Sequence, residues 1–339
     1  MSEACLTGAQ NAIARINADP HRTIKFDTVS RDPAGNIDLY ALMCQEILHN
    51  TPARHIIGCV TSWSRKEVIP TLEKHGGTLW YAVPYEGFEA SDHVVYLHAC
   101  PNQHLLPLLN WTFPKYGRRG YLTGSNYIWG WEINRLAREA INNAGGEVFG
   151  ERYLQIGSDD VDRMIEEIRA TSPDFVLNSL IGPSSYAFLK AYASLGEVDA
   201  RFQQDVRPVL SCNMTECELV EIGAAAEGLI AAGPYFQSPA KQFGSSHEAA
   251  ADRAVHSLAD LLEGDADADT LNIGALLRSP AGQNSGIDAK NHHMAQPVLI
   301  AKVQDGAFNV VHDCGIVGGD PYLTRPASLA MRSHLRVVS

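Results

Sequence analysis

The sequence lacks the features of a membrane protein and of a nucleic-acid-binding protein. It has no uninterrupted run of about 18 apolar residues, the length that a transmembrane helix needs. Its 27 Lys and Arg residues are outnumbered by 39 Asp and Glu residues, which gives a net charge of -12. This shortage of positive charge argues against direct binding to nucleic acid or to an anionic membrane.

The sequence also lacks the common enzyme signatures. It has no Walker phosphate loop, dinucleotide glycine fingerprint, nucleophile elbow or His-Glu-x-x-His motif. We therefore expect a protein that is not an enzyme and carries no cofactor. Its first residues, Met1 to Leu6, have neither the basic start nor the apolar run of a secretory leader. This predicts a cytoplasmic protein, or a periplasmic one if a leader lies upstream.

Cysteine and histidine are too sparse for a disulfide framework or a clear metal site. The seven cysteines are odd in number and spread along the chain, which favours buried free thiols. Cys212 and Cys217 lack a second pair at ligand spacing. Neighbouring residues of a strand point to opposite faces, so at most one of His292 and His293 could join a given site. We expect no metal, and surface or hinge histidines at these two positions.

The sequence does contain short β-branched runs that alternate with amphipathic segments, the pattern of an α/β protein with a parallel sheet. A length of 339 residues favours two domains. Helices are predicted over 37–49 and 63–75. Nine strands are predicted, over residues 23–29, 55–60, 78–83, 94–98, 120–123, 147–154, 174–180, 208–211 and 228–232.

Three polar or Pro-containing segments predict passages of the chain between two lobes: 99–103, 233–239 and 279–286. Near the end, Gln296–Gln304 and Ala307–His312 flank an Asp-Gly pair, which predicts an antiparallel hairpin. The acidic stretch Glu263–Asp269 is predicted to be a solvated loop.

Polar and aromatic residues collect just after the predicted strands, where open α/β sheets bind ligands. Four segments show this: Thr61–Arg65, Tyr81–Glu89, Gly124–Glu132 and the pair Tyr235 and Phe236. A single aromatic residue is more often part of the core than of a ligand site. Four such segments at corresponding positions favour a binding site instead.

These segments resemble a known family. Gly58 to Lys66, Tyr81-x-x-Pro-Tyr-Glu-Gly-Phe-Glu89, Pro101-Asn-Gln103, Gly124 to Ile128 and Pro234-Tyr-Phe236 look like the amide- and urea-binding branch of the type I periplasmic-binding-protein fold. Within it, the chain is most similar to the cytoplasmic amide sensors that negatively regulate the aliphatic amidase operon. The resemblance spans nearly the whole chain.

The resemblance implies two Rossmann-like lobes joined by three crossings and closing on a small ligand. Lobe 1 would comprise residues 1–100 and 236–282, and lobe 2 residues 101–235 and 283–339. Carried over position by position, the ligand pocket would be lined by Val60, Ser62, Tyr81, Val83, Pro84, Tyr127, Trp129, Ile181 and Tyr235. Ser62 would donate a hydrogen bond to a carbonyl oxygen of the ligand.

The chain departs from the family pattern in two ways. Val60, Val83 and Trp129 replace a tyrosine, a threonine and a tyrosine of the amide sensor, which favours a larger or more apolar ligand. The first central strand of the family has no counterpart in this sequence. Because a central strand hydrogen-bonds on both sides, we expect Thr23–Val29 either to pair directly with His55–Val60 or to be joined by a strand from a neighbouring chain.

Three functions are compatible with these features. The first is a cytoplasmic sensor of a small amide, urea or related compound that controls amide or nitrile metabolism through a regulator protein, such as an RNA-binding antiterminator. The second is the substrate-binding component of an amide or urea ABC transporter. The third, an amide or nitrile hydrolase, is disfavoured because Cys59 should be an inert buried thiol. A homo-oligomer is also expected.

Overall fold

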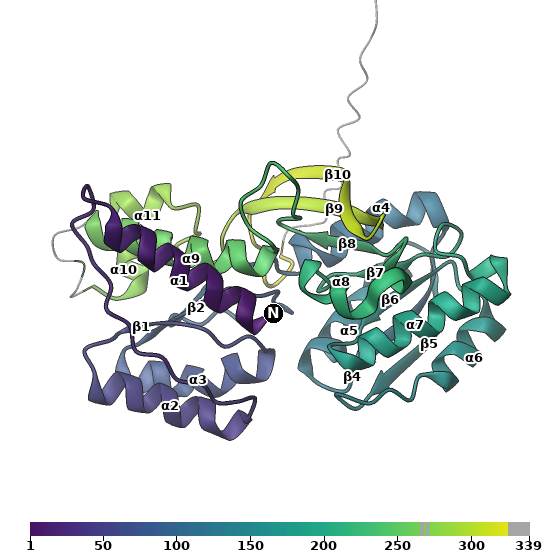
Figure 1. The fold of residues 1–339 in the computed structure, drawn as a ribbon, viewed down its shortest axis with the longest axis horizontal. Helices are drawn as coiled ribbons and strands as arrows, with labels where there is room; N and C mark the ends of the chain where they lie inside the picture. The colour runs from purple at the N-terminus through teal and green to yellow at the C-terminus, as the bar shows by residue number, and fades with distance from the viewer. Residues whose placement is uncertain (265–267, 269–270, 325–339) are drawn as a thin grey trace, which may run out of the picture.

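The computed structural model describes residues 1–264, 268 and 271–324. These residues form two α/β lobes that lie side by side (Figure 1). The predicted two-lobed α/β fold class is therefore confirmed. The acidic stretch Glu263–Asp269 lies partly outside the described residues, as does the end of the range predicted for lobe 2. The lobe boundaries themselves stay a prediction.

The first lobe is built on a three-stranded parallel sheet in the order β1-β2-β3. Its strands are β1 (His55–Ile57), β2 (Thr78–Tyr81) and β3 (Val94–Tyr96). Its helices are α1 (Ser2–Ala18), α2 (Ile37–Asn50), α3 (Ser62–His75), α9 (Ser246–Glu263), α10 (Ile273–Arg278) and α11 (Pro280–Asn284).

Both faces of this sheet are covered by helices. Leu79 and Tyr81 belong to an apolar cluster with residues of α1, α2, α3 and α9, whereas Trp80 belongs to a second cluster with residues of α9 and α10. This alternation follows the two-residue period of a β-strand. The sheet therefore lies between two helical layers, and its strand ends remain free for a site.

One edge of the sheet departs from the predicted arrangement. The residues of β1 pair with β2 and are all partly exposed, whereas β2 and β3 are fully buried. Thr23–Val29 forms no strand in the structure. The prediction that this segment pairs directly with His55–Val60 is therefore wrong, and pairing with a strand of a neighbouring chain stays a prediction.

Side chains replace the missing strand partner. The Phe26 amide donates to Asn17 Oδ1 at 2.8 Å, and the Phe26 carbonyl accepts from Asn17 Nδ2 at 2.8 Å. The amides of Thr23 and Ile24 donate to Glu263 Oε1 at 2.7 and 2.9 Å. Because these backbone groups are satisfied locally, the segment stays outside the sheet without leaving them unpaired.

The second lobe is built on a seven-stranded sheet in the order β10-β9-β8-β7-β6-β4-β5. Its strands are β4 (Arg119–Ser125), β5 (Glu147–Leu154), β6 (Phe175–Ser179), β7 (Val209–Ser211), β8 (Ile230–Gly233), β9 (Gln296–Gln304) and β10 (Ala307–Val317). Its helical segments are η1 (Pro101–Gln103), α4 (Leu105–Tyr116), α5 (Ile128–Asn143), α6 (Asp162–Thr171), α7 (Pro183–Val198), η2 (Ala200–Phe202), α8 (Glu216–Ile222) and η3 (Gly223–Ala226).

The predicted hairpin near the end of the chain is confirmed. β9 and β10 are antiparallel, and β9 also pairs antiparallel with β8, so the hairpin extends the parallel sheet. Asp305 and Gly306 at its turn have φ angles of 54° and 74°. Two consecutive residues with positive φ match the right-handed twist of the flanking strands.

Hydrogen bonds tie the segments between the lobes to one another. Gln103 Nε2 donates to the carbonyls of Met294 and Val317 at 3.0 and 2.7 Å. Asn102 Nδ2 donates to the Gly318 carbonyl at 2.9 Å. The first crossing is thus held against the segments on both sides of the hairpin, which fixes how the lobes meet.

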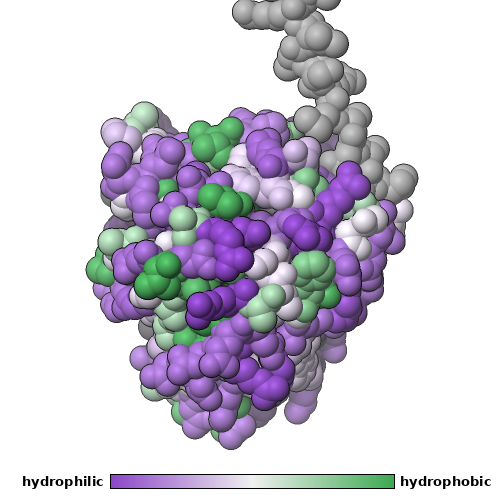
Figure 2. All heavy atoms as spheres, turned by 90° about the vertical axis from the view of Figure 1, so that its right-hand side faces the viewer, coloured by the Kyte–Doolittle hydropathy of each residue, from purple (hydrophilic) through white to green (hydrophobic). Residues whose placement is uncertain are grey.

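The outer face of the second lobe is largely hydrophilic, with apolar residues in separate patches (Figure 2). Among the described helices, none combines the length and the apolar character needed to cross a membrane.

Candidate functional site

A pocket opens between the lobes at the ends of several strands. It encloses about 300 Å³ of empty space, its open mouth included. Its lining residues come from both lobes: Met1, Val60, Thr61, Ser62, Tyr81, Val83, Pro84, Tyr127, Trp129, Ile181 and Asn213. Eight of the nine predicted site residues are in this set.

Tyr235 is the predicted residue that the pocket does not include. Its hydroxyl donates to the Phe243 carbonyl at 2.7 Å and accepts from the Phe243 amide at 3.0 Å. These bonds hold the side chain against its own loop. Conversely, Asn213 lines the pocket but was not predicted, although it follows β7 as the other site residues follow their strands.

The first turn of α3 is capped without the hydroxyl of Ser62. Thr61 caps the helix by accepting from the Ser64 amide at 3.2 Å, while the Ser64 hydroxyl accepts from the Thr61 amide at 3.1 Å. This reciprocal capping box provides hydrogen bonds to the backbone amides of Thr61 and Ser64 without using the Ser62 hydroxyl. The hydroxyl of Ser62, the first residue of the helix, is therefore available for other partners.

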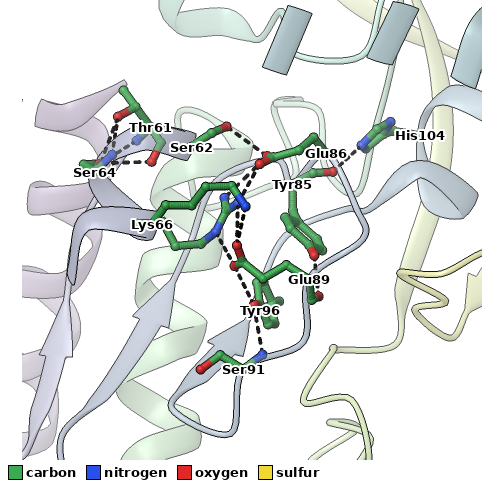
Figure 3. Close-up of polar contacts among 11 residues, drawn as sticks. Thr61, Ser62, Ser64, Lys66, Tyr85, Glu86, Glu89, Ser91, Tyr96 and His104 are labelled. Atoms are coloured by element: carbon green, nitrogen blue, oxygen red, sulfur yellow. Dashed lines mark hydrogen bonds and ion pairs between the residues drawn. The ribbon is translucent and has the colours of Figure 1, made fainter. Parts of the chain in front are cut away.

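Behind Ser62 lies a buried ionic network (Figure 3). Arg65, which is fully buried, binds Glu86 Oε1 at 2.6 Å and Glu89 Oε1 at 2.7 Å. Its guanidinium carbon also lies 4.8 Å from the ring centroids of both Tyr81 and Tyr85. Two carboxylates and two aromatic faces thus occupy this cation, and a ligand in the pocket cannot use it as a counter-ion.

Glu89 closes the network on its outer side. Its carboxylate accepts from Lys66 Nζ at 2.7 Å and from the Tyr96 hydroxyl at 2.8 Å. Burial acts to raise the pKa of Glu89, but Arg65 and Lys66 prevail and lower it to about 2. This carboxylate is charged throughout the physiological pH range.

Ser62 makes a hydrogen bond within the protein that the sequence did not predict. Ser62 Oγ donates to Glu86 Oε2 at 2.8 Å (Figure 3). Glu86 is an ionised partner of Arg65 and can only accept. Since a hydroxyl has one proton, Ser62 has its proton engaged by Glu86 in this structure, whereas the predicted role uses that proton for a ligand carbonyl. The sequence could not reveal this, because Glu86 is 24 residues away.

Donors come from the other side of the pocket. Trp129 is 3% exposed, and its Nε1–H has no hydrogen-bond partner among the described residues. A buried N–H without a partner is costly, so this group would gain from an acceptor brought within its reach. Burial raises the pKa of Tyr127, and the adjacent Ser62 side chain and backbone amide oppose the rise. The Tyr127 hydroxyl is therefore neutral.

The pocket lining within the described residues contains no Asp, Glu, Lys, Arg or His side chain. The lining side chains therefore offer neutral donors and acceptors between apolar walls. Cys59, beside the pocket, has a φ of 61° and a thiol whose pKa burial raises to about 12. Such a thiol is a poor nucleophile.

No cluster of potential metal ligands occurs in the described part of the chain. His292 and His293 are both buried, so the prediction of surface histidines is wrong. His293 stacks on the Tyr96 ring at 4.1 Å between centroids. The seven cysteines are all free; Cys314 is exposed, and Cys59 and Cys217 are partly exposed.

Comparisons with known proteins find a matching family and several similar solved structures. A family profile described as "periplasmic binding protein domain" matches residues 1–256. Similar solved structures include an ABC-transporter solute-binding protein of Rhodopseudomonas palustris in complex with 4-hydroxybenzoate, 19% identical, with a TM-score of 0.75 over 93% of this chain and 92% of that one. A second R. palustris solute-binding protein, in complex with benzoate, is 14% identical, with a TM-score of 0.78 over 94% and 93%.

A third similar structure is the branched-chain amino acid transporter substrate-binding protein of Streptococcus pneumoniae in complex with isoleucine. It is 16% identical, with a TM-score of 0.75 over 94% of both chains. At these identities the likeness concerns the fold, and the site's chemistry must be argued from this chain's own residues.

Proposed function

Because the chain belongs to the periplasmic binding protein domain family, we propose that it is a non-enzymatic binding protein whose interlobe pocket takes a small, uncharged molecule of the amide or urea class. The observation that carries this proposal is that one pocket is lined both by Trp129, whose Nε1–H has no partner among the described residues, and by Ser62, whose hydroxyl proton is engaged by Glu86. A primary amide presents both complements, a carbonyl oxygen and N–H groups.

The apolar walls define the rest of the ligand. Val60, Val83 and Ile181 line the pocket and offer no hydrogen bonds from their side chains. A substituent on the amide or urea would lie against them and gain from burial of its apolar surface. This supports a ligand larger or more apolar than the simplest amides.

Charge separates this ligand from those in the similar structures. 4-Hydroxybenzoate, benzoate and isoleucine each carry a carboxylate. Here a carboxylate would enter a pocket without a cationic side chain and face the lone pairs of Ser62, with Glu86 behind them. Burying an ion without a partner is strongly unfavourable.

For the role in the cell, we propose the solute-binding component of an ABC importer. The proteins with similar structures serve such transporters, which supports this role over that of a regulatory amide sensor. Fractionation of the source cells tests it: the native protein should be recovered with the periplasmic contents. Recovery with the cytoplasm, together with co-purification of a regulator, would instead support the sensor.

The ligand class is tested by isothermal titration with matched pairs, acetamide against acetate and benzamide against benzoate, at pH 7. We expect at least one of the two amides to bind, and each acid to bind about tenfold or more weakly than its amide, since one lost or unfavourable hydrogen bond has this effect. Preferential binding of the acids would contradict the proposal.

A further inference from the structure

Glu86 does not line the pocket, but it contacts Ser62, which does (Figure 3). Its Oε1 binds Arg65 at 2.6 Å and its Oε2 accepts from Ser62 Oγ at 2.8 Å. Arg65 and Glu86 are 0% and 1% exposed, so water does not compete for either contact. A guanidinium is permanently charged, and its bound carboxylate is therefore an obligatory acceptor.

This arrangement determines which way the Ser62 hydroxyl points. Its single proton is used by Glu86, and the oxygen lone pairs face the Tyr127 hydroxyl and the pocket. A neutral amide in place of the carboxylate could donate to Ser62 Oγ and release the hydroxyl proton. Ser62 would then offer the pocket a donor, the group that a carboxylate or a carbonyl oxygen requires.

We infer that Glu86 is a specificity-determining residue that acts through Ser62: it fixes Ser62 as an acceptor and so selects ligands that present an N–H group over ligands that present a carboxylate. This inference rests on the proposed function, because it specifies how the same pocket distinguishes an amide from an acid. Glu86 is a positioning residue in this scheme, since Ser62 makes the contact with the ligand.

The chain offers a matched control for the variant Glu86→Gln. Glu89 also binds the Arg65 guanidinium, at 2.7 Å, but makes no hydrogen bond to Ser62. Glu86→Gln and Glu89→Gln each remove one negative charge from the same buried network. A difference between them therefore reports the orientation of the Ser62 hydroxyl rather than the local charge.

The experiment measures the affinities of wild type, Glu86→Gln and Glu89→Gln for benzamide, benzoate, acetamide and acetate. We expect Glu86→Gln to lower the amide-to-acid affinity ratio about tenfold, the effect of exchanging one hydrogen bond, and Glu89→Gln to change it less than about threefold. In a Ser62→Ala background, Glu86→Gln should no longer change the ratio. An equal change in both Gln variants, or a change that persists in Ser62→Ala, would overturn the inference.

A ligand-free measurement keeps the test independent of the proposed function. Double-mutant cycles in guanidinium chloride should show coupling between Ser62 and Glu86 and none between Ser62 and Glu89. If wild type binds none of the probes, the proposed function fails, and the absence of Ser62–Glu86 coupling would then refute the inference as well. Should Glu86→Gln not fold, Glu86→Asp keeps the charge but withdraws the carboxylate from Ser62, and the ratio should fall in the same direction.

Discussion

Single polar groups determine what the pocket can bind. Trp129 Nε1–H is buried without a partner in the described part of the chain, whereas the nearby Ser62 hydroxyl has its proton engaged. The first group is a donor that gains a hydrogen bond only when a ligand arrives. The second is an acceptor whose direction is fixed in advance. In the proposed site, selectivity would therefore depend on hydrogen-bond polarity rather than on a charged side chain.

Trp129→Phe tests the donor. We expect it to weaken amide binding by about 1 to 3 kcal/mol, because the ligand carbonyl would be buried without its partner. Any loss of stability should come from the reduced ring volume in the core, since the indole N–H makes no hydrogen bond to the described residues. Trp131→Phe is the control: Trp131 is 45% exposed and donates to Asn126 Oδ1 in its own lobe. Unchanged affinity in Trp129→Phe, measured by titration calorimetry, would disprove this role.

Buried histidines predict the pH dependence of stability. Burial lowers the pKa of His104 from 6.5 to about 4 and that of His247 to about 3. Unfolding exposes both rings, which then bind protons below about pH 6.5. The contribution of these two histidines to the free energy of unfolding is therefore complete above about pH 6.5. It falls as the pH drops toward 4, by about 3 kcal/mol for His104 alone.

Denaturant midpoints between pH 7.5 and 4 at constant ionic strength measure this loss. His247→Leu should make the free energy of unfolding less dependent on pH, because one fewer proton is taken up on unfolding. It also removes two ring nitrogens that have no partner among the described residues. A midpoint that stays level from pH 7 to pH 5 would be inconsistent with buried neutral imidazoles.

At the scale of elements, close backbone contacts decide where helices can lie. Gly8 in α1 meets α9 so closely that an added Cβ would lie 2.3 Å from the Glu248 carbonyl oxygen. Because that neighbour is backbone, it cannot rotate away. The small residue is therefore what allows α1 to pack against α9 beside the sheet.

Gly8→Val tests this packing. We expect it to destabilise the protein by about 1 to 3 kcal/mol through overpacking, seen as a lower denaturant midpoint. Gln10→Val, at an exposed position of the same helix, adds the same β-branched side chain without the contact and is the control. If both variants lose stability equally, helix propensity rather than the α1–α9 contact explains the loss.

The open edge of the first sheet predicts a local difference in stability. The residues of β1 are all partly exposed, whereas β4, between two partners, is buried apart from Arg119. Backbone amides of His55–Ile57 should therefore exchange with deuterium faster than those of Gly120–Thr123 in ligand-free protein. Equal protection in a monomeric sample would show that the edge is covered.

Most elements follow from hydrophobic period and turn residues, and the failures have tertiary causes. The prediction of Glu147–Leu154 matches β5 at both ends. Thr23–Val29 has the composition of a strand, yet Asn17 and Glu263 take the hydrogen bonds that a partner strand would have made. Strand composition shows a preference for pairing, but whether a partner is in reach depends on the rest of the fold.

The same limit applies to the pocket. We predicted the pocket residues from the family resemblance and from the rule that ligand residues follow strand ends. The structure brings most of these residues together. The prediction failed for Tyr235, whose hydroxyl is engaged by the Phe243 backbone. It also could not give the direction of the Ser62 hydrogen bond, which depends on a carboxylate from another segment.

At the scale of the molecule, the two lobes touch outside the pocket as well as around it. The rings of Trp63 in α3 and Tyr127, the N-cap of α5, meet edge to face with centroids 5.2 Å apart. The Arg135 guanidinium of α5 lies 4.7 Å from the Phe88 ring centroid. These contacts stabilise the arrangement in which both lobes line one pocket, and in the Arg135–Phe88 contact neither residue lines that pocket.

Arg135→Gln tests this coupling. It removes the cation from the face of Phe88, whose amide also donates to the Pro321 carbonyl at 2.8 Å. An exposed cation–π contact contributes about 0.5 to 1 kcal/mol, so closure should be disfavoured and the apparent affinity for the ligand should fall about two- to fivefold. Small-angle scattering should show a larger radius of gyration for the ligand-free variant.

Arg138→Gln is the control for this variant, because Arg138 lies on the same helix and pairs with Glu151 within the second lobe. It should leave both the affinity and the radius of gyration unchanged. At a saturating ligand concentration, Arg135→Gln should have the wild-type radius of gyration, since the binding energy then stabilises the closed arrangement in place of the lost contact. Identical scattering and affinity in wild type and Arg135→Gln would mean that closure depends on the pocket residues and the crossings, and not on this contact.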